Sequence, residues 1–131
     1  MDSASSYLKK IDTLVRQHPE YAAEAYHFVM TGLNFTLSQL KTHRHVSGQE
    51  LSIGLKDYAL DQYGPLAATV LEHWGIRETI DFGKIVFFLI DAGLMKKTAD
   101  DSVDDFKEVY SFEECFGKGY DFLAYEHEND E

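Results

Sequence analysis

The chain has 131 residues, the length of one domain with a buried core, and its 44% apolar and 14% aromatic content is typical of a folded globular protein. It has no apolar run of about 18 residues, which excludes a transmembrane helix, and its first stretch, MDSASSYLKK, lacks the apolar segment of a secretory signal. A single cysteine excludes an internal disulfide and, without a CxxC motif, a thiol-based zinc site. We therefore expect a cytoplasmic protein with no metal and no other cofactor.

The net charge of −11 is concentrated in the C-terminal half of the chain. Residues 1–77 carry 7 Lys or Arg against 8 Asp or Glu, whereas residues 78–131 carry 5 against 15. Such a negative field repels nucleic-acid phosphates and attracts basic partners. Solubility is the alternative reason for an acidic surface.

Two helical segments are predicted over residues 6–40. Ser6 is suited to cap a first helix, whose apolar residues recur at helical spacing until His18, where the following Pro19 disfavours a helical conformation. Pro19 itself suits the first turn of the second helix, because its missing N–H is not needed there. The second segment is apolar along its length, and Gly32 either breaks it into two helices or lies within one.

A winged-helix-like core is predicted over residues 47–112. It begins with a capping box, in which Ser47 accepts a backbone N–H and Glu50 reaches back. That helix is predicted to end at Gly64, which can adopt a left-handed conformation, and Pro65 opens a shorter helix. Two helices joined by Gly-Pro and followed by a Gly-bearing turn are typical of a helix-turn-helix.

A very apolar helix and a β-hairpin complete this predicted core. The helix covers residues 79–92, with Thr79 as its cap and Gly93 at its end. Residues 94–98 and 106–112 are predicted as the two strands of the hairpin, with an acidic tip between them. Helix, stop and hairpin in this order are the recognition helix and wing of a winged helix.

The expected fold is a single domain, mostly α with a small β-hairpin. Residues 6–40 form added N-terminal helices over the winged-helix-like core. A short last helix or a fastened tail follows Phe112, and residues 126–131 are predicted to be disordered. The chain contains no internal repeat and no linker.

Several short segments of the chain are similar to segments of a known protein family. They are His45-Val-Ser-Gly-Gln-Glu-Leu51, Glu72-His-Trp-Gly-Ile76, Asp81-Phe-Gly83, Asp91-Ala-Gly-Leu94 and Phe112-Glu-Glu-Cys-Phe116. Over residues 21–116 the chain resembles an uncharacterised family of short proteins from the planctomycete and verrucomicrobial lineage. The resemblance implies a bacterial cytoplasmic protein of unknown function, with no catalytic residues to carry over. More loosely, residues 93–112 are similar to the wing of bacterial transcription regulators, except that acidic residues stand where those wings are basic.

The helix at 79–92 and the acidic tip form the candidate functional surface. The outward face of the helix is predicted to carry Asp81, Gly83, Lys84, Phe87, Phe88 and Asp91, of which Lys84, Phe87, Phe88 and Asp91 are the candidate partner-binding residues. The tip adds Asp100, Asp101, Asp104 and Asp105. A helix that is apolar on nearly all sides must be covered, either by the N-terminal helices or by a partner. A helix that reads DNA instead needs Arg, Lys, Asn or Gln on its outward face. The charge of this surface therefore disfavours DNA binding.

We therefore predict a non-enzymatic protein–protein interaction module whose partner has a basic or apolar surface. A second copy of the chain is one alternative for that partner. The alternative function is a DNA-binding transcriptional regulator of winged-helix type, with its basic connector on phosphate. No membrane partner is expected.

Smaller features indicate a weaker site and no catalysis. Lys41, His43, Arg44 and His45 form a basic connector that is predicted to bind an anion beside the next helix start. The histidines lack the spacing of a metal site, and no nucleophile or phosphate-loop motif occurs, so no catalytic residue is predicted. Trp74 is interpreted as core packing, with a pocket as the alternative.

Overall fold

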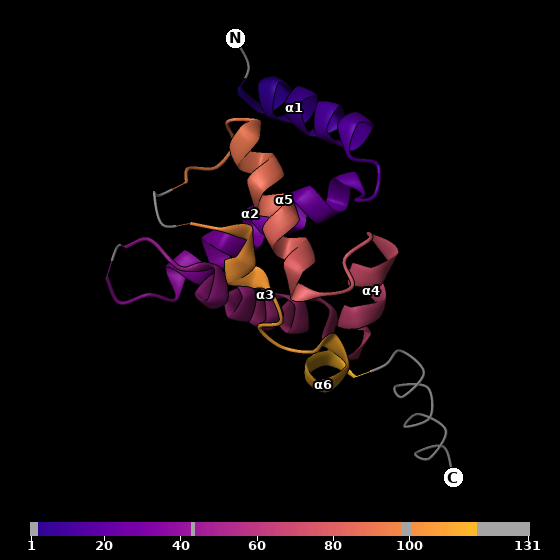
Figure 1. Cartoon of the computed structure of the whole chain (residues 1–131), viewed down its shortest axis with the longest axis vertical. Helices are drawn as coiled ribbons and strands as arrows, with labels where there is room; N and C mark the ends of the chain where they lie inside the picture. Colours follow the sequence, from indigo (N-terminus) through magenta and orange to yellow (C-terminus); the bar gives the residue numbers. More distant parts are fainter. Residues whose placement is uncertain (1–2, 43, 98–100, 118–131) are drawn as a thin grey trace.

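The computed structural model describes residues 3–42, 44–97 and 101–117, and every regular element in that part of the chain is helical (Figure 1). In chain order the elements are α1 (Ser3–Gln17), α2 (Ala23–Ser38), α3 (Gly48–Tyr63), the 3₁₀ turn η1 (Gly64–Leu66), α4 (Ala67–His73), α5 (Thr79–Asp91), the 3₁₀ turn η2 (Val103–Phe106) and α6 (Phe112–Phe116). Within the described ranges, no helix is long and apolar enough to cross a bilayer. α1 begins ahead of the cap predicted at Ser6.

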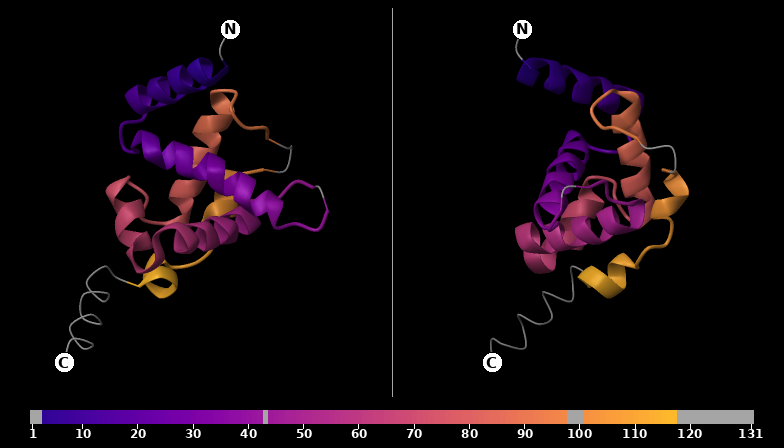
Figure 2. Two further views of the ribbon diagram at one scale, coloured as in Figure 1. Left: turned by 180° about the vertical axis from the view of Figure 1, so that it is seen from behind. Right: turned by 90° about the vertical axis from the view of Figure 1, so that its left-hand side faces the viewer.

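The hydrophobic core lies between α2, α3 and α5, with α1 across one end of the molecule and α6 at the other (Figures 1 and 2). The largest side chains that are fully shielded from solvent are Tyr26, Val29, Leu55, Leu71, Ile76, Phe82, Ile85 and Leu89. Three of these, Phe82, Ile85 and Leu89, belong to the very apolar helix predicted at residues 79–92. α5 is central, because η2 also packs against it.

The predicted β-hairpin and winged-helix-like core are wrong, since the described residues contain no strand. The chain instead returns over α5 as η2 and buries Phe106 between α3 and α5, leaving it 4% exposed. Two glycines make room for the ring. A Cβ added at Gly83 would lie 2.8 Å from Cδ1 of Phe106, and one at Gly48 would lie 2.9 Å from its Cε1. This two-glycine slot holds an aromatic anchor where a wing strand was expected.

Serine caps explain why this segment starts helical turns. Ser102 accepts from the N–H of Asp104, and Asp105 accepts from the N–H of Ser102 at 3.0 Å, which opens η2. Ser111 accepts from the N–H of Glu114 and opens α6. These short-range hydrogen bonds favour turns over an extended ladder. Residues 98–100, part of the predicted first strand and tip, lie outside the described residues.

The start of α5 differs from the prediction, because Glu78 and not Thr79 is its N-cap. Asp81 Oδ2 accepts from the N–H of Glu78 at 3.1 Å and from the N–H of Arg77 at 2.8 Å. Thr79 is 1% exposed, and its hydroxyl accepts from the N–H of Val109 at 3.1 Å. The threonine thus fastens the chain after η2 to α5, a long-range role that local spacing does not reveal.

α2 is one continuous helix, so the break considered at Gly32 does not occur. Pro19, predicted in its first turn, lies in the turn before it. Thr36 donates its hydroxyl to the carbonyl of Gly32 at 2.8 Å and sits against Gly54 of α3. Glycines on both helices therefore bring α2 and α3 into close contact.

The predicted start and end of α3 are confirmed. Ser47 Oγ accepts from the N–H of Glu50 at 3.1 Å, and Glu50 Oε1 accepts from the N–H of Ser47 at 3.0 Å. Gly64 follows α3 with a φ of 53°, and Gly93 follows α5 with a φ of 77°. Both angles lie in the left-handed region that glycine adopts without a Cβ penalty.

Candidate functional site

The outward face of α5 is the predicted functional surface, and its residues have different surroundings. Lys84 and Asp91 are exposed, whereas Phe87 and Phe88 are half-buried. Phe87 lines a groove between α2 and α5, and Phe88 lines a cleft between α1 and α5. The apolar side chains of α5 therefore lie partly in the core and partly at two surface cavities.

The first cavity, the α2–α5 groove, has a volume of about 520 Å³ and is lined mainly by apolar side chains. Its walls include Met30, Leu33, Asn34 and Leu37 on α2, Phe87 and Ile90 on α5, Leu94 and Met95 just beyond α5, and the buried Val46, Leu51, Val86 and Phe106. The α2 residues are spaced by three and four, so they form one stripe along that helix. Two neighbouring helices thus present apolar stripes to the same open space.

At the rim of this groove Arg44 is paired with Glu50 and His45 with Asp101, and Lys96 also lines the groove. Arg44 Nη1 donates to Glu50 Oε1 at 3.1 Å, and its Nη2 donates to Oε2 at 2.7 Å. This bidentate contact, with the N–H of Ser47, lowers the pKa of Glu50 to about 2. His45 Nε2 lies 3.1 Å from Asp101 Oδ1. The rim therefore joins residues that the sequence assigned to two separate sites.

The residues of the predicted anion patch lie on the connector before α3. Lys41, Arg44 and His45 are exposed, and His43 lies outside the described residues. The guanidinium of Arg44 is already held by the carboxylate of Glu50. An external anion at Arg44 would have to compete with that carboxylate.

The four aspartates of the predicted tip do not stand on a hairpin. Asp100 lies outside the described residues, and Asp101 is half-buried at the groove rim. Asp104 is exposed, while Asp105 is half-buried and caps η2. Because η2 packs against α5 and α3, the described carboxylates lie over the body of the protein.

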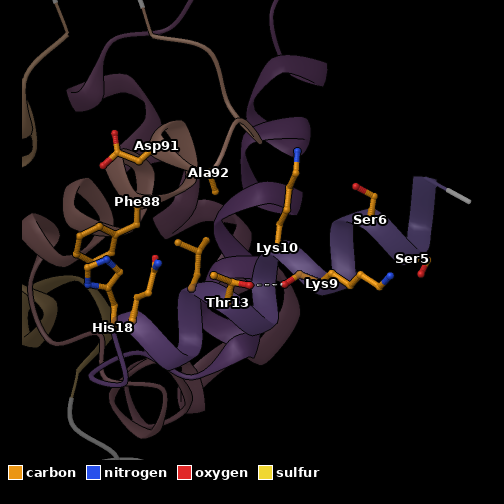
Figure 3. Close-up of a pocket in the computed structure, with 11 residues that line it drawn as sticks. Ser5, Ser6, Lys9, Lys10, Thr13, His18, Phe88, Asp91 and Ala92 are labelled. Atoms are coloured by element: carbon orange, nitrogen blue, oxygen red, sulfur yellow. Dashed lines mark hydrogen bonds between the residues drawn. The ribbon is translucent and has the colours of Figure 1, made fainter. Parts of the chain in front are cut away.

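The second cavity, the α1–α5 cleft, has a volume of about 550 Å³. Figure 3 shows the rings of His18 and Phe88 side by side; their centroids are 3.6 Å apart and their planes differ by 6°. Lys9 and Lys10 project from α1 at the same cleft. The ammonium of Lys10 lies near Gly93, at the negative end of the α5 dipole. These contacts fasten α1 to α5.

Phe87 and the rim residues of the α2–α5 groove were predicted from the sequence, but its apolar wall on α2 was not. A signal was present, since α2 is apolar on more than one face. Phe28 and Val29 are buried in the core, while Met30 and Leu33 beside them line the groove. A helix apolar on two faces indicates a second surface to be covered.

Comparison of the chain with family models, with curated proteins and with solved structures gave no match. The resemblance of residues 21–116 to short bacterial proteins stays a prediction. The function is therefore inferred from the geometry of the cavities and from their charges.

Proposed function

We propose that this protein is a non-enzymatic protein–protein interaction module whose partner places an apolar helix in the α2–α5 groove. The observation that supports this most is the half-buried Phe87 beside an open groove of about 520 Å³ with two helical walls. Apolar surface in such a groove gains free energy when a partner removes it from water. The interaction surface is this groove and not the predicted hairpin, which the described chain does not form.

The shape of the groove favours a helix as its occupant. On α2 the stripe from Met30 to Leu37 is about 10 Å long at 1.5 Å per residue, which is roughly two helical turns. A partner helix with apolar side chains at three- and four-residue spacing can pack its ridges between those of α2 and α5. Met30 and Met95 add unbranched side chains that adapt to the shape of a ligand.

The charge of the protein favours a basic partner. A net charge of −11 attracts positively charged chains and raises their rate of encounter. Lys or Arg residues flanking the apolar face of the partner helix would use this attraction without entering the groove. We therefore expect an amphipathic helix with an apolar face and basic flanks.

Photocrosslinking tests this proposal. A photoreactive p-benzoylphenylalanine replacing Phe87 should capture a partner in cells, whereas the same residue replacing Lys84, which is exposed on α5 outside the groove, should not. The captured segment should carry apolar residues at helical spacing and basic flanks. Equal capture from both positions, or capture of a segment without that pattern, would refute the groove as the binding site.

Binding of the captured segment as a synthetic peptide provides the quantitative test. Phe87→Asp should weaken binding by at least about tenfold, because it places a charge at the centre of an apolar interface. Asp91→Asn, on the same helix outside the groove, should leave the affinity unchanged within about twofold. A crosslinked species composed only of this chain would assign the groove to a second copy and overturn the partner proposed above.

A further inference from the structure

A third cavity, which we call the aromatic pocket, is formed where α1, α2, α3 and α4 meet. Its volume is about 480 Å³. Aromatic rings from all four of these regions line it: Tyr7, Phe28, Tyr58, Tyr63 and Trp74. Phe28 is buried, whereas the other four are half-buried and keep part of their surface open. The pocket is separate from the α2–α5 groove and shares no lining residue with it.

The rings that line the pocket pack against one another at different angles. Tyr63 and Trp74 pack edge to face, with their planes at 81° and their centroids 5.8 Å apart. Phe28 lies 5.8 Å from Trp74 and 5.4 Å from Tyr58, at angles of 53° and 37°. Several π-systems in differing planes therefore border one space, which a compact ligand can contact on more than one side.

The phenols of Tyr7 and Tyr63 remain uncharged at neutral pH, because the pKa of each is raised. Burial raises the pKa of Tyr7, and burial followed by the proximity of Tyr58 raises the pKa of Tyr63. The hydroxyl of Tyr7 is also within hydrogen-bond distance of His27 Nδ1, at 3.1 Å. These rings consequently contribute a negative face through their quadrupole and no ionic charge.

The charge at the aromatic pocket is negative. Glu24, exposed in the first turn of α2, lines it, and no Lys or Arg is among its lining residues in the described part of the chain. The α1–α5 cleft contrasts with it, because Lys9 and Lys10 line that cavity. Aromatic faces with a single carboxylate, on a protein of net charge −11, are complementary to a cation.

We propose that the aromatic pocket binds a trimethylammonium group. Rings such as those of Tyr63 and Trp74 attract a cation placed over their faces, and methyl groups on that cation fill the apolar space between them. An unmodified lysine ammonium is a compact and strongly hydrated charge, so it gains less from entering an aromatic pocket. Both a free trimethylammonium metabolite and a trimethylated lysine of another protein carry this group.

Titration of the intact protein with choline tests the proposal, with 3,3-dimethylbutan-1-ol as the uncharged compound of the same shape. Trp74 is the single tryptophan of the chain, so its fluorescence reports binding at the pocket, and calorimetry gives an independent readout. Choline should bind saturably and at least about tenfold more tightly than the alcohol, since only the cation interacts with the ring faces. Equal binding of the two, or no saturable binding of choline, would overturn the proposal.

Variants of the lining residues separate the ring from the hydroxyl and the carboxylate. Tyr63→Leu should weaken choline binding by about tenfold, whereas Tyr63→Phe, which keeps the ring, should stay within about twofold of the wild type. Glu24→Gln should weaken it by roughly threefold, and Glu72→Gln, an exposed carboxylate of α4 outside the pocket, should have no effect. Circular dichroism confirms that each variant is folded. Weakening by Tyr63→Phe equal to that by Tyr63→Leu would refute a role for the ring face.

A short peptide containing trimethyl-lysine distinguishes the two sources of the group. Tighter binding of this peptide than of choline would assign the pocket to a modified protein, and equal or weaker binding would assign it to a free metabolite. The same peptide with unmodified lysine should bind at least about tenfold more weakly than its trimethylated form. Equal binding of the two peptides would overturn the proposal.

Discussion

The two-glycine slot predicts that replacing Gly83 by alanine destabilises the protein. Replacing a helical glycine by alanine normally stabilises a helix by about 1 kcal/mol. At Gly83, however, the added Cβ would lie 2.8 Å from both Cγ and Cδ1 of Phe106 and 2.9 Å from its Cβ. The Phe106 Cβ is fixed to the backbone, so rotating the ring cannot relieve the contact. Overpacking of this kind costs about 1–3 kcal/mol, and we expect Gly83→Ala to be destabilising by about 1–2 kcal/mol.

A double-mutant cycle separates the clash from other effects. Phe106→Ala alone should cost about 3–5 kcal/mol, because it empties a buried aromatic site. In that background the contacts with Cγ and Cδ1 are gone but the 2.9 Å contact with Cβ stays, so Gly83→Ala should cost less than in the wild type. The size of its effect therefore depends on the aromatic ring.

Urea unfolding followed by Trp74 fluorescence and circular dichroism measures these differences. Lys84→Ala, an exposed change at the next position of α5, should alter the free energy of unfolding by less than about 0.5 kcal/mol. A stabilising Gly83→Ala in the wild-type background, or an equal cost in both backgrounds, would refute the account of the slot.

Two further predictions concern polar contacts. Because the Arg44 contact and the capping box lower the pKa of Glu50 from its ordinary value of 4.5 to about 2, they stabilise the fold above pH 4.5, and this contribution is lost as the pH falls toward 2. Glu50→Gln should therefore have a lower melting temperature than the wild type at pH 7, with the gap closing between pH 4.5 and about 2; a gap independent of pH would contradict this. Thr79→Val keeps the shape of a buried side chain but leaves the N–H of Val109 without its acceptor, so it should cost about 1–3 kcal/mol in urea unfolding, whereas a neutral effect would show that the bond is unimportant.

Features that depend on neighbouring residues were predictable from the sequence. The capping box of Ser47 and Glu50 requires only residues three apart, and its hydrogen bonds are present. Gly64 and Gly93 end helices because a left-handed residue suits a helix end and glycine adopts it readily. The localisation and the interaction function stay predictions.

The hairpin prediction failed because long-range contacts decide the conformation after residue 101. The segment 106–112 carries aromatic residues at even positions, which imitates the alternation of a strand. Phe106 is held between two glycines, and the Tyr110 hydroxyl donates to the carbonyl of Ser52 at 2.7 Å. Glu108 has a φ of 50°, which no extended strand accommodates. Partners this distant in sequence are not visible from local periodicity.

The cavities were only partly predictable for a similar reason. An outward phenylalanine on α5 followed from helical spacing, and Phe87 is half-buried at a groove. The groove itself depends on α2 lying beside α5, which the pattern of either helix does not specify. The aromatic pocket gathers rings from positions as distant as Tyr7 and Trp74, and each alone reads as ordinary core packing.

The position of Phe106 has a consequence for synthesis on the ribosome. Gly48 and Gly83 both emerge before the ring that fits between them, so α3 and α5 leave the exit tunnel with a gap at their contact. The contact between α3 and α5 is therefore completed only after residue 106 has been translated. A nascent chain halted before that point would offer an unfilled apolar notch, the kind of surface that chaperones recognise.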